Sequence, residues 1–175
     1  MQKVAVTSFA PYLYCLMRTD MDSLNPGKAI AQGIHAGHVF TYQMNRLKDQ
    51  YAQVWTNPIL FREYEEMKAE EEVKTHGFYN QNIRNLTLFK QWEMTSLKTP
   101  GFGTTITLDI GNEKTLLDTV AAVSNYGYPA GVAHDDEYPV GDGEITHLVP
   151  LNTCGYAFGD KDELAFILGQ FELHF

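Results

Sequence analysis

The order of apolar and polar positions in the first third of the chain predicts a strand followed by a long helix. Tyr12 to Met17 is an unbroken apolar run that stops at Arg18-Thr19-Asp20, which predicts a buried strand with polar groups at its carboxyl end. From Lys28, after the turn signature Asn25-Pro26-Gly27, apolar residues recur at helical spacing. One side of this helix should carry Ile30, Ala31, Ile34, His35, His38, Val39 and Tyr42.

A second strand and helix are predicted after a glycine-rich break. Thr104 to Asp109 alternates apolar residues with threonines, as in a strand with one buried face. Asn112 is placed to cap a helix that Gly127 ends.

The last part of the chain predicts a hairpin and a short helix. Ala130 to Ala133 forms the third strand, and Ile145 to Pro150 pairs back against it through a turn at Gly141-Asp142-Gly143. Asp160 and Glu163 resemble a capping box that begins the final helix.

This order of elements predicts an α/β fold with a mixed four-stranded sheet and helices on both faces, because the third and fourth strands are joined as a hairpin. Residues 1–175 are expected to form a single domain that carries a mainly helical insertion at about residues 46–99. In that insertion aromatic and charged residues mix, and six glutamates gather between Glu63 and Glu72.

Composition narrows the function classes. The 175 residues are 44% hydrophobic, enough for a sizeable core, and no apolar run approaches the roughly 20 residues of a membrane helix. We therefore expect a cytoplasmic protein without a membrane partner. The net charge of −9 disfavours a general nucleic-acid coat protein, so any contact with nucleic acid must be local. Cys15 and Cys154 show no zinc spacing and are expected to be reduced, structural thiols.

Lys28 and His35 are the first candidates for chemistry. They lie seven residues apart, so two helical turns bring both side chains to one face. Lys28 beside the helix N-terminus would favour a phosphate or an oxyanion, although a solvated lysine is the alternative. His35 could instead be a core histidine. His35 and His38 share a face, but a third ligand and the HExxH glutamate are lacking, so we expect no metal and no cofactor.

Two further groups allow both a functional and a structural interpretation. Asp135, Asp136 and Glu137 could supply a general base, since crowded carboxylates raise one another's proton affinity, or they could form a hydrated acidic turn. Lys90 stands between Phe89 and Trp92, and the three could present a stacking surface to nucleic acid, although buried aromatic residues are commoner.

The chain resembles the type II (archaeal and eukaryotic) peptidyl-tRNA hydrolases. Strand, Arg18-Thr19-Asp20, loop, and then Gly27-Lys28-x-x-x-Gln32-x-x-His35-Ala36 looks like the opening signature of that family. The segments Leu88 to Glu93 and Gly169 to Leu173 match more loosely and in the right order.

The resemblance implies hydrolysis, without a metal, of the ester that joins a peptide to the 3′ end of tRNA. The partner would be peptidyl-tRNA or tRNA, and a homodimer is compatible with the family. By resemblance the catalytic residues are Lys28, His35 and Asp135 or Asp136. The substrate-binding residues by the same match are Arg18, Asp20, Gly27, Gln32 and Lys90.

One segment departs from the family pattern. Family members carry Asp-Ala-Gly-x-Thr-Gln after the third strand, whereas this chain has His134-Asp135-Asp136-Glu137-Tyr138-Pro139, which keeps an aspartate but has no matching threonine. The alternative function is therefore a catalytically impaired binding protein of the same fold that holds tRNA or a protein partner.

Overall fold

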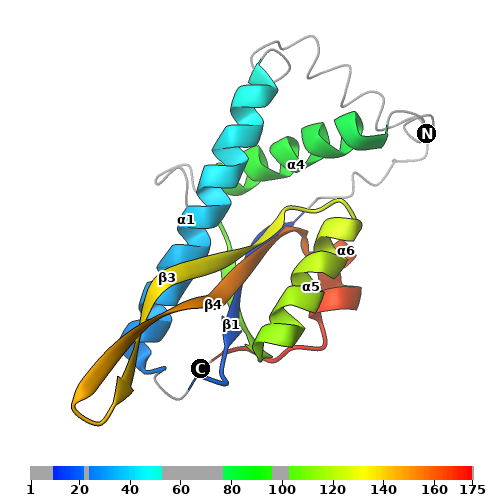
Figure 1. Cartoon of the computed structure of the whole chain (residues 1–175). Coiled ribbons are helices and arrows are strands. Elements are labelled where there is room, and N and C mark those ends of the chain that lie inside the picture. The colour runs from blue at the N-terminus through cyan, green and yellow to red at the C-terminus, as the bar shows by residue number, and fades with distance from the viewer. Residues whose placement is uncertain (1–9, 22–23, 53–76, 96–102, 175) are drawn as a thin grey trace, which may run out of the picture.

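The protein folds into three layers, a sheet between two pairs of helices (Figure 1). The computed structural model describes residues 10–21, 24–52, 77–95 and 103–174. Within these ranges it contains four strands and four helices, and the predicted α/β fold with a mixed four-stranded sheet is confirmed. The predicted glutamate cluster between Glu63 and Glu72 lies outside the described residues.

The sheet has the strand order β2-β1-β4-β3. Its strands are β1 (Pro11–Arg18), β2 (Thr105–Gly111), β3 (Ala130–Asp142) and β4 (Ile145–Asp160). β1 runs parallel to β2, and β4 runs antiparallel to both β1 and β3. The carboxyl ends of β1 and β2 therefore lie at one edge of the sheet, called the carboxyl edge below, and β3 runs in the same direction as these two strands.

Two helices cover each face. α1 (Pro26–Gln50) and α4 (Gly77–Glu93) pack on one face, and α5 (Glu113–Asn125) and α6 (Lys161–Leu168) pack on the other (Figure 1). Asn112 caps α5 through its side chain, as the sequence predicts, and Asp160 caps α6 by accepting from the backbone N–H groups of Asp162 and Glu163. These caps satisfy backbone donors that a helix start leaves without partners.

α1 differs from the sequence expectation in its start and in its buried face. Asn25 is its N-cap and accepts a 3.0 Å hydrogen bond from the Lys28 backbone N–H, so Asn-Pro-Gly begins the helix instead of forming a separate turn. The buried series is Gln32, Ala36, Phe40 and Met44, whereas Ile30, Ile34, His35 and Tyr42 are exposed. The buried face is thus a narrower i, i+4 stripe than the apolar residues suggest.

α4 lies inside the predicted insertion and supplies part of the core. Its Phe89 and Trp92 pack with Phe40 of α1, whose ring centroid lies 4.8 Å from that of Phe158 on β4. The Trp92 indole N–H donates to the carbonyl of Thr104, 2.9 Å away, at the start of β2. The aromatic side chains around Lys90 are therefore buried and do not form a stacking surface.

The hairpin strands are much longer than predicted. β3 continues through the acidic residues to Asp142, so His134 to Glu137 lie in an irregular strand and not in a turn. β4 continues to Asp160, and its second half is the central strand that pairs with β1. Gly155 and Gly159 weaken the strand pattern of this segment in the sequence. The packing requires a glycine at position 155, because a Cβ there would meet the Gly131 carbonyl and Leu116 at 2.8 Å.

Candidate functional site

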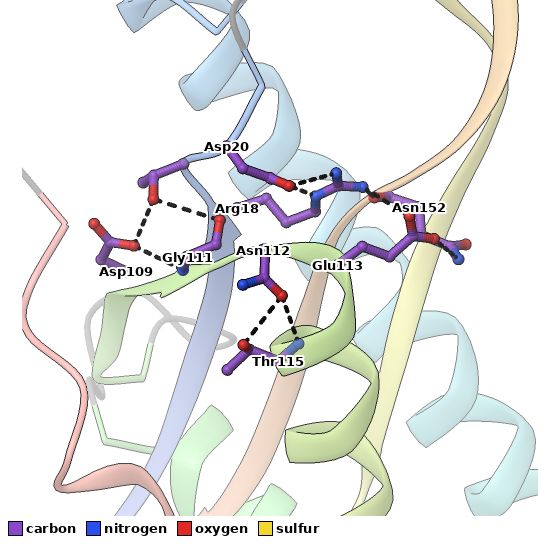
Figure 2. A network of polar contacts seen from close by, with 9 residues as sticks. Arg18, Asp20, Asp109, Gly111, Asn112, Glu113, Thr115 and Asn152 are labelled. Atoms are coloured by element: carbon purple, nitrogen blue, oxygen red, sulfur yellow. Dashed lines mark hydrogen bonds and ion pairs between the residues drawn. The ribbon is translucent and has the colours of Figure 1, made fainter.

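A continuous set of polar contacts runs along the carboxyl edge (Figure 2). Arg18, at the end of β1, is buried and forms a two-point ion pair with Asp20 at 2.8 and 3.0 Å. Its Nη1 donates to the backbone carbonyl of Asn152 on β4 at 2.6 Å and lies 3.5 Å from the carboxylate of Glu113, the first residue of α5. The predicted pair Arg18 and Asp20 is therefore assembled at the edge as one unit.

The network continues to the outer strand of the sheet. The Asn152 side-chain amide donates to Glu113 Oε1 at 2.8 Å, and its Oδ1 lies 2.8 Å from His134 Nδ1 on β3. His134 Nε2 lies 3.4 Å from Asp136 Oδ1. This series of contacting side chains thus follows the order of the strands from the end of β2 to β3. It comprises Glu113, Arg18, Asn152 and His134.

Hydrogen bonding to Arg18 lowers the pKa of Asp20 below its ordinary value, and the positive charge of the guanidinium adds to the effect.

The end of β1 also contacts the end of β2. The Thr19 hydroxyl and the Gly111 N–H both donate to Asp109 Oδ1 at 2.8 Å (Figure 2). Gly111 has a φ of 73°, which a residue with a Cβ rarely adopts. The loop from β2 to α5 is therefore fixed against the end of β1.

An open cleft of about 520 Å³ lies between α1 and β3. Its lining comprises His35, His38, Val39, Ala133, His134, Asp135, Asp136 and Glu137. The structure thus brings His35 together with Asp135 and Asp136, three of the residues predicted as catalytic. It also places His38 and His134 there, so imidazole rings from a helix and a strand face one set of carboxylates.

The carboxylates of the cleft are not equivalent. Asp135 Oδ1 accepts a 3.0 Å hydrogen bond from the backbone N–H of Glu137, which fixes it in the irregular part of β3. The Asp136 side chain is 90% exposed, and its Oδ1 lies 3.4 Å from His134 Nε2, a contact that is an ion pair only when the imidazole is protonated. Asp136 is therefore the carboxylate with more freedom to face a bound molecule.

Lys28 lies beside the cleft and reaches the neighbouring part of the hairpin. Its Nζ donates to the carbonyl of Pro139 at 3.0 Å and lies 4.8 Å from the centroid of the Tyr138 ring. Lys28 is half-buried, so it differs from the solvated lysine without a functional role that the sequence also allowed. An ammonium group has three N–H donors, and Pro139 accepts from only one of them.

The other predicted substrate-binding residues lie in different surroundings. Gln32 is buried, and its side-chain oxygen accepts from the hydroxyl of Thr153, so it joins α1 to β4 inside the core. Gly27 is exposed in the first turn of α1. Lys90 is exposed near the end of α4, which lies beside the start of β2 and away from the carboxyl edge. Gln32 and Lys90 are therefore not brought to the cleft. Gly27, Lys28, Arg18 and Asp20 are also not among the residues that line it.

Sequence reasoning missed Glu113, Asn152 and His134 as parts of this site. Glu113 reads as an ordinary first-turn helix residue, and Asn152 falls in the half of β4 that was not predicted. His134 carried a signal, because it directly follows the predicted third strand and precedes the acidic residues.

The two cysteines lie beneath α1 and take no part in the cleft. Both are buried and free, and burial raises the pKa of Cys15 to about 11 and that of Cys154 to about 12. Over the described ranges, no group of three or more histidine, cysteine, aspartate or glutamate side chains is arranged to hold a metal ion.

A second cleft, of about 580 Å³, lies between α1, α4 and the end of α5, at the end of the sheet opposite the carboxyl edge. Its lining is mostly apolar and includes amide side chains, two of which, Gln81 and Asn85, both donate to the Gly127 carbonyl. No residue predicted as catalytic or substrate-binding lines it. The cleft between α1 and β3 is therefore the candidate functional site.

Among known proteins, no family model and no curated sequence matches this chain. In the part of the chain that the structure describes, no helix combines the length and the apolar character needed to cross a bilayer.

Proposed function

We propose that this protein hydrolyses the ester bond of peptidyl-tRNA and releases free tRNA and peptide. The observation that carries the proposal is the cleft between α1 and β3, in which His35 lies with Asp135 and Asp136 although they are far apart in the sequence. The sequence resemblance to the peptidyl-tRNA hydrolase family supports the proposal, because the histidine of the Gly-Lys-x-x-x-Gln-x-x-His pattern is His35, which lines this cleft.

Hydrolysis of an acyl ester needs a proton acceptor for the attacking water and a positive group for the developing oxyanion or a neighbouring phosphate. The imidazole and carboxylate groups of the cleft supply acceptors. Lys28 supplies the cation at the N-terminal end of the same helix, where the helix dipole adds to its charge. No step of this scheme requires a metal ion.

The charge of the protein restricts the way tRNA binds. The net charge is −9, and the cleft itself carries three acidic side chains, which repel a polyphosphate chain. We therefore propose contact with the acceptor end alone, through Lys28 and few other cations. Such a small number of phosphate contacts gives a shallow salt dependence. For each phosphate contact, the affinity should fall by about tenfold or less when the salt concentration rises tenfold.

A second candidate is a binding protein of the same fold with impaired catalysis. It is favoured by the contacts of Lys28, whose ammonium group is already held by the Pro139 carbonyl and the Tyr138 ring. The residues that replace the family's Asp-Ala-Gly-x-Thr-Gln also carry no threonine. This candidate predicts salt-sensitive binding of tRNA without turnover.

The test is release of free tRNA from an N-blocked aminoacyl-tRNA without added metal. Wild type is compared with Lys28→Ala and His35→Ala, and Lys114→Ala serves as the matched control, because Lys114 is exposed on α5 and pairs with Asp118. We expect turnover by wild type and the control, and a loss of about a hundredfold or more in the cleft variants. Thermal unfolding of each variant verifies that it is folded.

Two results would each overturn part of this proposal. Lys28→Ala at full rate would remove Lys28 from the mechanism. A folded wild type that binds tRNA but releases none would favour the binding protein.

A further inference from the structure

Within the described residues, His134 is the one imidazole of the cleft that has a hydrogen-bond partner, and a carboxylate lies near its other ring nitrogen. Nδ1 faces Asn152 Oδ1 at 2.8 Å, and Nε2 lies 3.4 Å from Asp136 Oδ1. The side chains of His35 and His38 are exposed and make no hydrogen bond or ion pair within the described part of the chain. Of the three rings, His134 is therefore the one that the protein orients.

Two irregularities in the β3–β4 pairing place this ring. Ala133 pairs with Cys154 and His134 pairs with Asn152, so Thr153 is an extra residue on β4. The register shifts again between Asp135 and Tyr138, where Asp136 and Glu137 of β3 lie opposite the single residue Pro150 of β4. Bulges of this kind re-aim side chains, and they are common next to active sites.

The neighbours of Asn152 determine which way its side-chain amide points. The Glu113 carboxylate, next to the Arg18 guanidinium, accepts hydrogen bonds and cannot donate one, so the group 2.8 Å from it must be the NH₂ of Asn152. The amide oxygen of Asn152 then faces His134, and it can only accept. Nδ1 of His134 must therefore carry a proton.

A neutral imidazole with its proton on Nδ1 has its lone pair on Nε2. We propose that Nε2 of His134 is the proton-accepting atom of the cleft, and that Asn152 and Glu113 are the positioning residues that hold this tautomer. The inference rests on the proposed function for its substrate. It adds a general base that the sequence motif does not contain.

In the reaction, Nε2 takes a proton from water while the water oxygen attacks the ester carbonyl carbon. The tetrahedral intermediate then breaks its bond to the ribose oxygen, and the imidazolium returns the proton to that leaving oxygen. The products are the carboxylic acid of the peptide and the free ribose hydroxyl. The exposed Asp136 carboxylate lies where it can stabilise the imidazolium.

Titratable or charged groups from several elements lie around the ring. Asp135, Asp136 and Glu137 come from β3, and His35 and His38 come from α1. Glu113 from α5 and Arg18 from β1 act through Asn152. Substitutions that remove a charge are therefore compared in pairs. Glu113→Ala and Glu113→Gln remove the same charge and differ in whether an acceptor for the Asn152 amide remains.

The first experiment is nitrogen NMR of the histidine rings in the free protein, at a pH high enough for neutral imidazole. Wild type should show His134 with a protonated Nδ1 and an unprotonated Nε2. Asn152→Ala should lose this preference and give a mixture of tautomers. A wild-type ring protonated on Nε2 would overturn the inference, and this result needs no substrate.

The second experiment measures kcat and KM for tRNA release in His134→Gln, Asn152→Ala, Glu113→Ala and Glu113→Gln. We expect kcat to fall about a hundredfold or more in His134→Gln, with loss of the acid limb of the pH–rate profile. Asn152→Ala and Glu113→Ala should lower kcat about tenfold or more with little change in KM. Glu113→Gln should be largely active, because its amide oxygen still accepts from Asn152.

His147→Gln is the matched control, because His147 is exposed on the outer part of the same hairpin. His134→Gln with wild-type kcat would overturn the inference. A wild type that releases no tRNA contradicts the proposed function instead, and the NMR experiment then decides the tautomer by itself.

Discussion

The hydroxyl of Thr153 donates a hydrogen bond to the side-chain oxygen of Gln32, and both side chains are excluded from solvent. The thiol of Cys154 donates to the backbone carbonyl of Gln32 at 3.1 Å. Consecutive residues of a regular strand point to opposite faces, but the bulge at Thr153 lets both reach the same residue of α1. Gln32 therefore fixes α1 on the sheet from inside the core.

Gln32→Ala should lower the free energy of unfolding by about 1–3 kcal/mol, because it leaves the buried Thr153 hydroxyl with only the 3.4 Å contact to the Ala133 carbonyl and opens a small void. Turnover per folded molecule should be retained, since Gln32 does not line the cleft. Denaturant unfolding and tRNA release measure the two effects. Gln50→Ala, at the exposed end of α1, is the control. Unchanged stability with lost substrate binding would return Gln32 to the substrate site.

Gly155→Ala should destabilise the protein by about 1–3 kcal/mol, because the new Cβ would overlap backbone in the centre of the sheet. Gly37→Ala is the matched substitution, since nothing lies within 4 Å of its Cβ position on α1. There we expect a gain of about 0.5–1 kcal/mol from the better helix former. Thermal or denaturant unfolding of the pair checks the prediction, and equal effects would contradict it.

Asp20→Asn should weaken the protein at neutral pH and matter less in acid. The pKa of Asp20 is lowered by its hydrogen bonds with Arg18, so the carboxylate stabilises the fold above the unfolded-state pKa of about 3.9. That contribution is lost as the pH falls through the lower folded-state value. Because Asp20 is 38% exposed, we expect a loss of about 1 kcal/mol or less at pH 7.

The measurement for Asp20 is the free energy of unfolding of both proteins from neutral pH down to about pH 3, a range set by the ordinary aspartate value. The two curves should converge toward the acid end. A difference that grows in acid would reverse the sign and contradict the assigned cause.

The two thiols should be inert in the native protein. Burial raises the pKa of Cys15 to about 11 and that of Cys154 to about 12, so neither is a thiolate at neutral pH, and neither is open to a reagent. An aromatic disulfide reagent should therefore label no thiol in the native protein and two thiols after unfolding in guanidinium. Rapid labelling of the native protein would contradict the buried placement.

The sequence alone determined the elements that rest on local chemistry. Asn112 and Asp160 satisfy the N–H groups of their own helices, so these caps depend only on residues a few positions away. The apolar run of β1 and its polar end also identify a buried strand without knowledge of its neighbours. The fold class also followed from local patterns, because the order of the predicted strands and helices indicates an α/β fold.

Only the tertiary structure decided the central half of β4 and the polar network of the site. Gly155 weakens the strand pattern, and its role becomes visible only when the Gly131 carbonyl and Leu116 lie against it. Glu113, Asn152 and His134 are separated in the sequence and meet because β2, β4 and β3 share one sheet. Pairing between distant strands leaves no periodic signal in one segment, so a bulge and the ring that it aims cannot be predicted from that segment alone.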